Sequence, residues 1–159
     1  MGTKRGKLLA PSSTHAKLDD QLCFALYAAS RAVSGAYRQL LVDVGLTYPQ
    51  YLAMLSLWEE NAQSVAALGD ALDLESSTLS PLIRRLETLG LVRRQRSGTD
   101  ERVVHVHLTD AGRALEARCA PVREQVEAST GLSDEEFAGL RAALHQLRAT
   151  VQEVPAARA

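Results

Sequence analysis

The segment Leu22-Cys-Phe-Ala-Leu-Tyr27 places a thiol and a phenol one helical turn apart, in a chain with only two cysteines and four tyrosines. Both groups lie near the start of a helix, which apolar residues recurring every three or four positions predict from Leu18 onward. The amino end of a helix favours negative charge, and a phenol can donate a hydrogen bond to a thiolate. Cys23 is therefore placed to form the thiolate, which is the species that attacks peroxides.

Further hydroxyl groups fall on the face of this helix that carries Cys23. Ser30, Ser34 and Tyr37 follow it by seven, eleven and fourteen residues. At about 100° per residue, this spacing keeps them within about 40° of the cysteine. The competing interpretation is a buried cysteine that acts as a small apolar side chain, and spacing alone favours that common role.

The second cysteine, Cys119, shares a helix face with Leu115, Val122 and Val126, which indicates a core position. Two cysteines so far apart do not make a disulfide framework, and we expect them to stay reduced in the cytoplasm. No group of histidines and cysteines has the spacing of metal ligands, since His105 and His107 only alternate along one strand. We therefore expect no metal and no other cofactor.

The elements that must position these groups follow from periodicity and capping residues. Helices are predicted at 18–45, 47–60, 64–72, 76–90, from 109 onward, and at 133–151. Asp19 or Asp20 is expected to cap the first helix, and Pro121 is expected to interrupt the one that begins at Thr109. Strands are predicted at 91–96 and 102–108, joined by a turn at 97–101. A helix, a short helix, a turn, a third helix and a hairpin form the order of a winged helix-turn-helix. The expected fold is thus mainly α with a small β-hairpin wing.

The long helices at both ends exceed what a winged helix-turn-helix needs, and two-fold dimerisation is the simplest way to cover their apolar stripes. We expect a basic, disordered N-terminal tail at 1–17 and a dimerisation and sensor helix at 18–46. The DNA-binding domain is expected at 47–108, C-terminal dimerisation helices at 109–153 and a tail at 154–159. No apolar run approaches the roughly 18 residues of a membrane span, and no signal peptide is evident, so we expect a cytoplasmic protein.

Positive charge is concentrated in one segment of a chain whose net charge is −1. Residues 76–104 carry six arginines against three acidic residues, as expected for contact with double-stranded DNA. Short hydroxyls at the start of the fourth helix suit base edges, and arginines on the wing suit the minor groove. The alternative is a solvated hairpin. The candidate DNA-contacting residues are Ser76, Ser77, Thr78, Ser80, Arg84, Arg85, Arg94, Arg96, Asp100 and Arg102.

The stretch from Ser76 to Gly112 resembles the core of the MarR family of transcriptional regulators. It contains the Asp-x-Arg of the wing, at Asp100 and Arg102, followed by Leu-Thr-x-x-Gly at 108–112. The resemblance extends from about residue 18 to 151. It implies a homodimer on a pseudo-palindromic operator, with Arg102 in the minor groove and Asp100 orienting it.

Within that family, residues 20–27 and 46–51 resemble the organic hydroperoxide resistance regulators. This resemblance implies that Cys23 is a peroxide sensor, that Tyr37 and Tyr48 donate hydrogen bonds to it across the dimer interface, and that Tyr27 is a third, nearby aromatic residue. It also implies a repressor that leaves its operator when an organic hydroperoxide oxidises Cys23, with a small thiol as a further reactant.

Two rival functions remain from the residues alone. One is a repressor of the same family that is released by a phenolic or aromatic carboxylate ligand, without redox chemistry. The other is a thiol peroxidase, against which stand the lack of an arginine beside Cys23 and of a Cys-x-x-Cys motif. We therefore expect a regulator and not an enzyme, with DNA, a second copy of the chain and an organic hydroperoxide as partners, and no membrane.

Overall fold

The computed structural model describes residues 17–98, 100 and 102–153. The predicted tails at 1–17 and 154–159, apart from Lys17, lie outside these residues, as do Thr99 and Glu101 of the wing tip. The described part contains the helices α1 (Leu22–Leu40), α2 (Tyr48–Glu59), α3 (Val65–Leu72), α4 (Ser76–Thr88), α5 (Asp110–Ser129) and α6 (Asp134–Gln152). Short 3-10 turns at Leu18–Asp20 and Val42–Val44 flank α1, and the strands are β1 (Gln63–Ser64), β2 (Val92–Arg96) and β3 (Val104–Leu108).

The helices begin where local side chains can satisfy the first backbone N–H groups. The Ser64 and Thr109 hydroxyls accept hydrogen bonds from the N–H groups of Ala67 and Gly112. Ser133 and Glu136 bond reciprocally, which opens α6 with a capping box. These predicted starts are confirmed, as is the mainly helical fold with a wing.

Four details of the elements differ from prediction. The first helix, predicted at 18–45, is divided into α1 (Leu22–Leu40) and a 3-10 turn on either side of it, so Gly45 ends the second turn and not the helix. Asp19 and Asp20 do not cap the first helix, because they form a 3-10 turn and Gln21 takes the N-cap position without a side-chain bond. Pro121 does not interrupt α5, whose buried residues on both sides of the proline keep the helix packed against the core. The sheet has a third strand, since the two residues of β1 pair antiparallel with β3, in the order β1-β3-β2.

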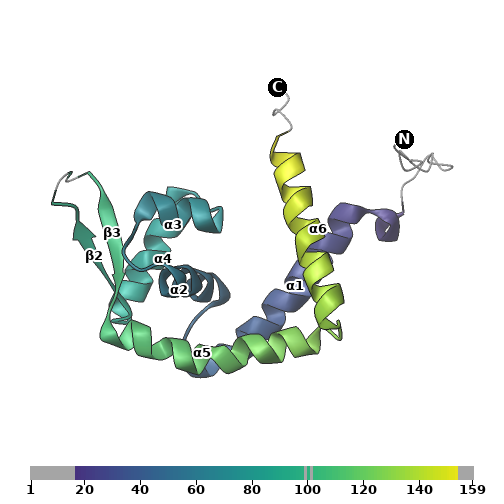
Figure 1. Cartoon of the computed structure of the whole chain (residues 1–159), viewed down its shortest axis with the longest axis horizontal. Helices are drawn as coiled ribbons and strands as arrows, with labels where there is room; N and C mark the ends of the chain where they lie inside the picture. Colours follow the sequence, from purple (N-terminus) through teal and green to yellow (C-terminus); the bar gives the residue numbers. More distant parts are fainter. Residues whose placement is uncertain (1–16, 99, 101, 154–159) are drawn as a thin grey trace.

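The molecule has a compact lobe and an open arm (Figure 1). The lobe holds α2, α3, α4 and the sheet, and α5 runs along the base from the sheet to the foot of α6. The lobe contains most of the core, including the fully buried side chains of Tyr51, Met54, Leu57, Leu68, Leu79, Ile83, Leu86 and Val106. The arm consists of α1 and α6, and by contrast neither of these helices contains a buried residue.

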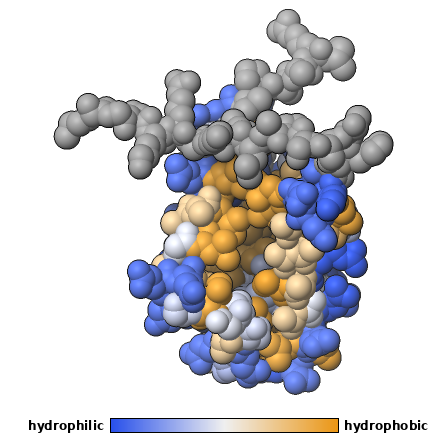
Figure 2. All heavy atoms as spheres, turned by 90° about the vertical axis from the view of Figure 1, so that its right-hand side faces the viewer, coloured by the Kyte–Doolittle hydropathy of each residue, from blue (hydrophilic) through white to orange (hydrophobic). Residues whose placement is uncertain are grey.

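The arm carries unpartnered apolar side chains. Leu22, Leu140 and Val151 are 61%, 51% and 60% exposed. Figure 2 shows this side of the molecule, where apolar residues line a hollow bordered by hydrophilic ones.

Within the described residues, no helix is both long enough and apolar enough to cross a membrane.

Candidate nucleic-acid interface and thiol site

Helix α4 presents polar side chains on the face opposite its core contacts. Leu79, Ile83 and Leu86 are buried, and the hydroxyl residues at the start of the helix, together with Arg84 and Arg85, lie outside or at the edge of the core. α4 begins at Ser76, as predicted, so Pro81 is its sixth residue and removes one hydrogen bond of the second turn. The exposed residues of this face are Ser76, Ser77, Thr78, Arg84 and Arg85, with Ser80 half-buried.

A groove of about 470 Å³ runs between the start of α4 and the wing. Ser76 and Ser80 line it from the helix, and Arg94 and Arg102 line it from the wing. The structure thus brings together four of the predicted DNA-contacting residues from two elements. Arg96 lies apart from them, beside a smaller depression that Arg94 also lines.

The wing is fixed to α4 by Arg94. Its guanidinium forms an ion pair with Glu87, with Nη2 2.8 Å from Oε2, and its backbone N–H also donates to Glu87 at 3.1 Å. The hydrogen bonds from Arg94 hold the pKa of the Glu87 carboxyl below its ordinary value. Because both side chains are well exposed to solvent, the pair contributes little stability and mainly sets the position of β2.

At the tip of the wing, Asp100 organises the backbone. Its carboxylate accepts a hydrogen bond from the N–H of Arg102 at 3.0 Å, and its carbonyl accepts one from the N–H of Val103 at 3.0 Å. The carboxylate that the sequence places beside Arg102 therefore contacts the arginine's main chain. This fixes the point from which the Arg102 side chain leaves the wing.

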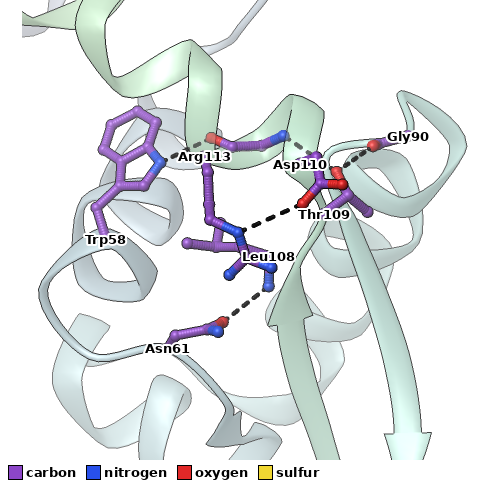
Figure 3. A network of polar contacts seen from close by, with 8 residues as sticks. Trp58, Asn61, Gly90, Leu108, Thr109, Asp110 and Arg113 are labelled. Carbon is purple, nitrogen blue, oxygen red and sulfur yellow. Dashed lines mark hydrogen bonds and ion pairs between the residues drawn. The ribbon is translucent and has the colours of Figure 1, made fainter.

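The base of the wing is closed by the Leu-Thr-x-x-Gly segment (Figure 3). The Thr109 hydroxyl donates to the carbonyl of Gly90 at 2.6 Å and accepts from the N–H of Gly112 at 3.0 Å. The backbone N–H of Thr109 donates to the carbonyl of Leu91 at 3.0 Å. A Cβ atom on Gly112 would lie 2.0 Å from that same Leu91 oxygen, so the site has room only for glycine.

Two residues of the lobe complete this junction, and sequence reasoning missed both. The Trp58 Nε1 donates to the carbonyl of Gly112 at 2.9 Å, and the Asn61 amide oxygen accepts from the N–H of Leu108 at 2.8 Å. Figure 3 shows both side chains approaching from the α2 end, on the side opposite Gly90. Their partners are 54 and 47 residues away, which is why no local pattern in the sequence could point to them.

Cys23 is the second residue of α1 and is exposed. Tyr27, one turn further, is 57% exposed, and its hydroxyl accepts a hydrogen bond from Arg31 Nη1 at 2.9 Å. The Ser34 hydroxyl donates to the carbonyl of Ser30 in the preceding turn, so it serves its own helix. Among the residues of the predicted polar face, Tyr27 is thus the phenol that lies nearest to Cys23 along α1.

Tyr37 and Tyr48 meet where α1 and α2 converge. Their rings stack with centroids 4.7 Å apart, and the Tyr51 ring lies 5.4 Å from Tyr37. Burial raises the pKa of Tyr37 and of Tyr48, so both phenols keep their protons well above neutral pH and remain hydrogen-bond donors. Cys23 precedes Tyr37 by fourteen residues of one helix, about 21 Å along its axis, so the two cannot meet within one chain.

The two stacked phenols border an apolar hollow of about 380 Å³. Val33 of α1 and residues of α5 and α6, including Val126, Phe137 and Leu140, form its walls. Helices α1 and α6, which supply part of these walls, lie on the side of the molecule that Figure 2 shows.

Cys119 is 2% exposed and packs with Leu115, Val122 and Val126 on the buried face of α5, as the stripe predicts. Burial raises the pKa of its thiol, and the nearby Arg118 offsets only part of that effect. It also borders a cleft between α2 and α5 that Tyr51 and Trp58 line. Across the described residues, no three His, Cys, Asp or Glu side chains are grouped as a metal site requires.

Residues 36–118, just over half of the chain, match the family described as transcriptional regulator SarA/Rot. The chain is 48% identical over 149 residues to the HTH-type transcriptional regulator TtmR of Methylorubrum extorquens, a match that covers 89% of this chain and 76% of that protein. It is 40% identical over 139 residues to the organic hydroperoxide resistance transcriptional regulator of Bacillus subtilis, covering 87% of this chain and 95% of that protein.

Solved structures give the same assignment of the fold. The chain superposes on reduced AbfR bound to DNA, a protein of Staphylococcus epidermidis, with a TM-score of 0.72 and 38% identity. The match covers 85% of this chain and 92% of that one. That protein has also been solved bound to DNA in an overoxidised form, and in a form with a disulfide.

Proposed function

Because the chain belongs to the MarR/SarA type of transcriptional regulators, we propose that it is a redox-sensing repressor whose thiol, Cys23, is oxidised by organic hydroperoxides. Relatives that cover most of the chain are named transcriptional regulators, so its role is DNA-binding regulation. The sensing role rests on one observation: two stacked phenols, both able to donate a hydrogen bond, stand at the edge of an apolar hollow. The Bacillus subtilis relative, named for organic hydroperoxide resistance, supports it.

DNA recognition is assigned to α4 and the wing. The exposed hydroxyls and arginines of α4 suit the major groove, where short side chains and guanidinium groups contact base edges. The wing carries Arg102 to the adjoining minor groove, and Arg96 lies on the same hairpin to meet phosphate. The groove that joins Ser76, Ser80, Arg94 and Arg102 supports one continuous interface.

The sensor requires a dimer. Fourteen residues of helix separate Cys23 from Tyr37, so the phenols that bind its thiolate come from the partner chain. A second copy also covers the apolar side chains that α1 and α6 leave exposed, such as Leu22 and Leu140. Dimerisation through α1, α5 and α6 sets the spacing of the two α4 helices on a pseudo-palindromic operator.

The chemistry follows from thiolate attack on a peroxide. The Cys23 sulfur bonds to the terminal oxygen of the hydroperoxide, the O–O bond breaks, and the alkoxide leaves and takes up a proton to become an alcohol. The sulfur is oxidised by two electrons to sulfenic acid. A small external thiol then condenses with it, giving a mixed disulfide and water. The product no longer accepts the phenol bonds as the thiolate did, and the helices of the dimer interface shift.

The direct test is an electrophoretic DNA-shift assay on a palindromic operator. We expect the reduced protein to bind, a stoichiometric organic hydroperoxide to release it, and a dithiol to restore binding. Release by an aromatic carboxylate without any thiol oxidation would favour the ligand-responsive alternative, for which the cleft beside Tyr51 and Trp58 and the hollow beside Tyr37 and Tyr48 are two candidate cavities. Continuous turnover of peroxide with a dithiol would instead indicate a thiol peroxidase.

The arginines of the interface are expected to act differently from one another. Arg102→Ala should weaken binding to all sequences and make the slope of log K against log salt shallower by about 0.9, the value for one neutralised phosphate. Arg84→Ala should relax discrimination at one base position by about 1–3 kcal/mol, provided that its guanidinium binds a guanine edge. Fluorescence anisotropy over a salt series, with single-base operator variants, measures both. Equal weakening of every operator by Arg84→Ala would mean that Arg84 binds phosphate.

Cys119→Ser should leave sensing intact. The Cys119 thiol is buried, and its raised pKa makes it a poor nucleophile, so an external thiol should resolve the oxidised Cys23. Burying a hydroxyl in place of the thiol should lower stability by about 1–2 kcal/mol. Non-reducing electrophoresis after peroxide is the measurement. A cross-linked dimer band that the variant lacks would show that Cys119 is the resolving thiol.

A further inference from the structure

Three side chains follow one another along a single face of α1. Cys23, Tyr27 and Arg31 are spaced by four residues each, so they lie one above another on the helix surface. The Arg31 guanidinium donates a hydrogen bond from Nη1 to the Tyr27 oxygen at 2.9 Å. Its central carbon also lies 5.6 Å from the centroid of the Tyr27 ring. Two separate contacts therefore fix the arginine on the phenol.

The direction of these contacts matters. Side chains on a helix lean toward its amino end, so Arg31 lies over Tyr27 and Tyr27 leans toward the turn that carries Cys23. The Tyr27 oxygen accepts from Arg31, and the phenol proton remains to be donated further along the same face. Within one chain, Tyr27 lies about one helical turn from Cys23, whereas Tyr37 lies about 21 Å from Cys23 along the helix axis.

We propose that Arg31 is a positioning residue that acts through Tyr27 on the Cys23 thiolate. The inference rests on the proposed sensing function and names a residue that controls it. A charged donor on the phenol oxygen polarises the O–H bond, which strengthens the onward hydrogen bond to the thiolate. Arginine suits this role because its guanidinium stays charged at every pH at which the thiol titrates.

The charged residues nearest to the thiol along the chain are Lys17, Asp19 and Asp20 on one side and Arg31 on the other. Asp19 and Asp20 belong to the turn that precedes α1, and Lys17 stands before that turn. Arg31 is the first charged residue after the thiol on α1, and its guanidinium contacts the Tyr27 phenol. A relay to Cys23 along this face of α1 therefore begins at Arg31 and passes through Tyr27.

The test is the rate of Cys23 alkylation by iodoacetamide across about pH 5.5 to 9.5, in the full-length Cys119→Ser chain so that one thiol is measured. Arg31→Ala should slow alkylation by about three- to tenfold near pH 7. The difference should vanish at the alkaline end, where the thiol ionises without help. Arg31→Lys keeps the charge and should recover part of the rate.

A double-mutant cycle separates a relay from a direct effect of charge. Tyr27→Phe should slow alkylation, and Arg31→Ala added to it should slow alkylation no further. Arg113→Ala, which removes an exposed arginine at the base of the wing, is the matched control and should react like the parent.

Additive effects in the cycle would overturn the relay, and so would an Arg31→Ala profile that matches the parent at every pH. Both outcomes leave the proposed function intact, because that function is tested by peroxide-driven release of DNA from the parent chain. A parent that alkylates with the expected cycle but never releases DNA would overturn the sensing function alone.

Discussion

Cys23→Ser is expected to bind operator DNA as tightly as the wild-type chain and to stay bound after an organic hydroperoxide is added. Serine keeps the shape of the side chain, and its hydroxyl can be solvated at an exposed position in the first turn of α1, so folding should not change. Its oxygen cannot form a sulfenic acid, so the peroxide has no site of reaction there. The wild-type protein should lose about 10- to 100-fold in affinity on oxidation, a span typical of coupled sites.

The measurement is the apparent Kd for operator, before and after one equivalent of cumene hydroperoxide, by fluorescence anisotropy. Cys119→Ser is the matched control, since it removes the other thiol and should still release DNA. Peroxide-driven release that survives Cys23→Ser would falsify the sensor assignment. If release persists in both single variants and disappears in the double variant, either thiol alone is sufficient for the response.

Gly112→Ala is expected to destabilise the protein strongly. The added methyl group would lie 2.0 Å from the Leu91 carbonyl oxygen, which is itself held by the N–H of Thr109. Relief requires α5 to move away from the base of the wing, which breaks the bonds of Thr109 and Trp58 at this junction. We expect a loss of about 3 kcal/mol, at the upper end of the range for overpacked sites. For a chain of this length, the melting temperature should fall by about 6–12 °C.

Differential scanning calorimetry at one fixed protein concentration is the appropriate measurement, because dimerisation makes melting concentration-dependent. Gly139→Ala in α6 is the control, as its added methyl group meets no atom within 4 Å. That variant should be neutral or slightly more stable, since alanine favours a helix interior over glycine. Equal melting temperatures for Gly112→Ala and wild type would show that the junction yields easily.

The parts of the fold that the sequence predicts correctly depend on residues close together in the chain. The starts of α3, α5 and α6 each follow from a hydroxyl and an N–H group three residues on. Strand β1 could not be found in this way, because its two residues are strands only by virtue of pairing with Val106 and His105 of β3. The error at Pro121 has a related origin: packing of α5 against the rest of the chain outweighs the local penalty of a proline.

The candidate site could likewise be predicted only in part. The types and spacing of Cys23, Tyr27, Tyr37 and Tyr48 are visible in the sequence, and so is the cluster of arginines around α4 and the wing. What the sequence could not show is which polar groups are already paired. Arg94 is held by Glu87, and Arg31 is bonded to Tyr27, both through contacts that depend on side-chain direction.

The bond between Trp58 and Gly112 also gives the protein a built-in optical reporter. Trp58 is the only tryptophan in the chain, and its indole N–H is anchored to α5 while its ring belongs to α2. The Tyr51 ring lies 6.3 Å from it, edge to face. Any displacement of the lobe against α5 changes the hydrogen bonding and the surroundings of this indole, and therefore its emission spectrum. Intrinsic fluorescence can thus follow the lobe in real time, without a label and in the unmodified protein.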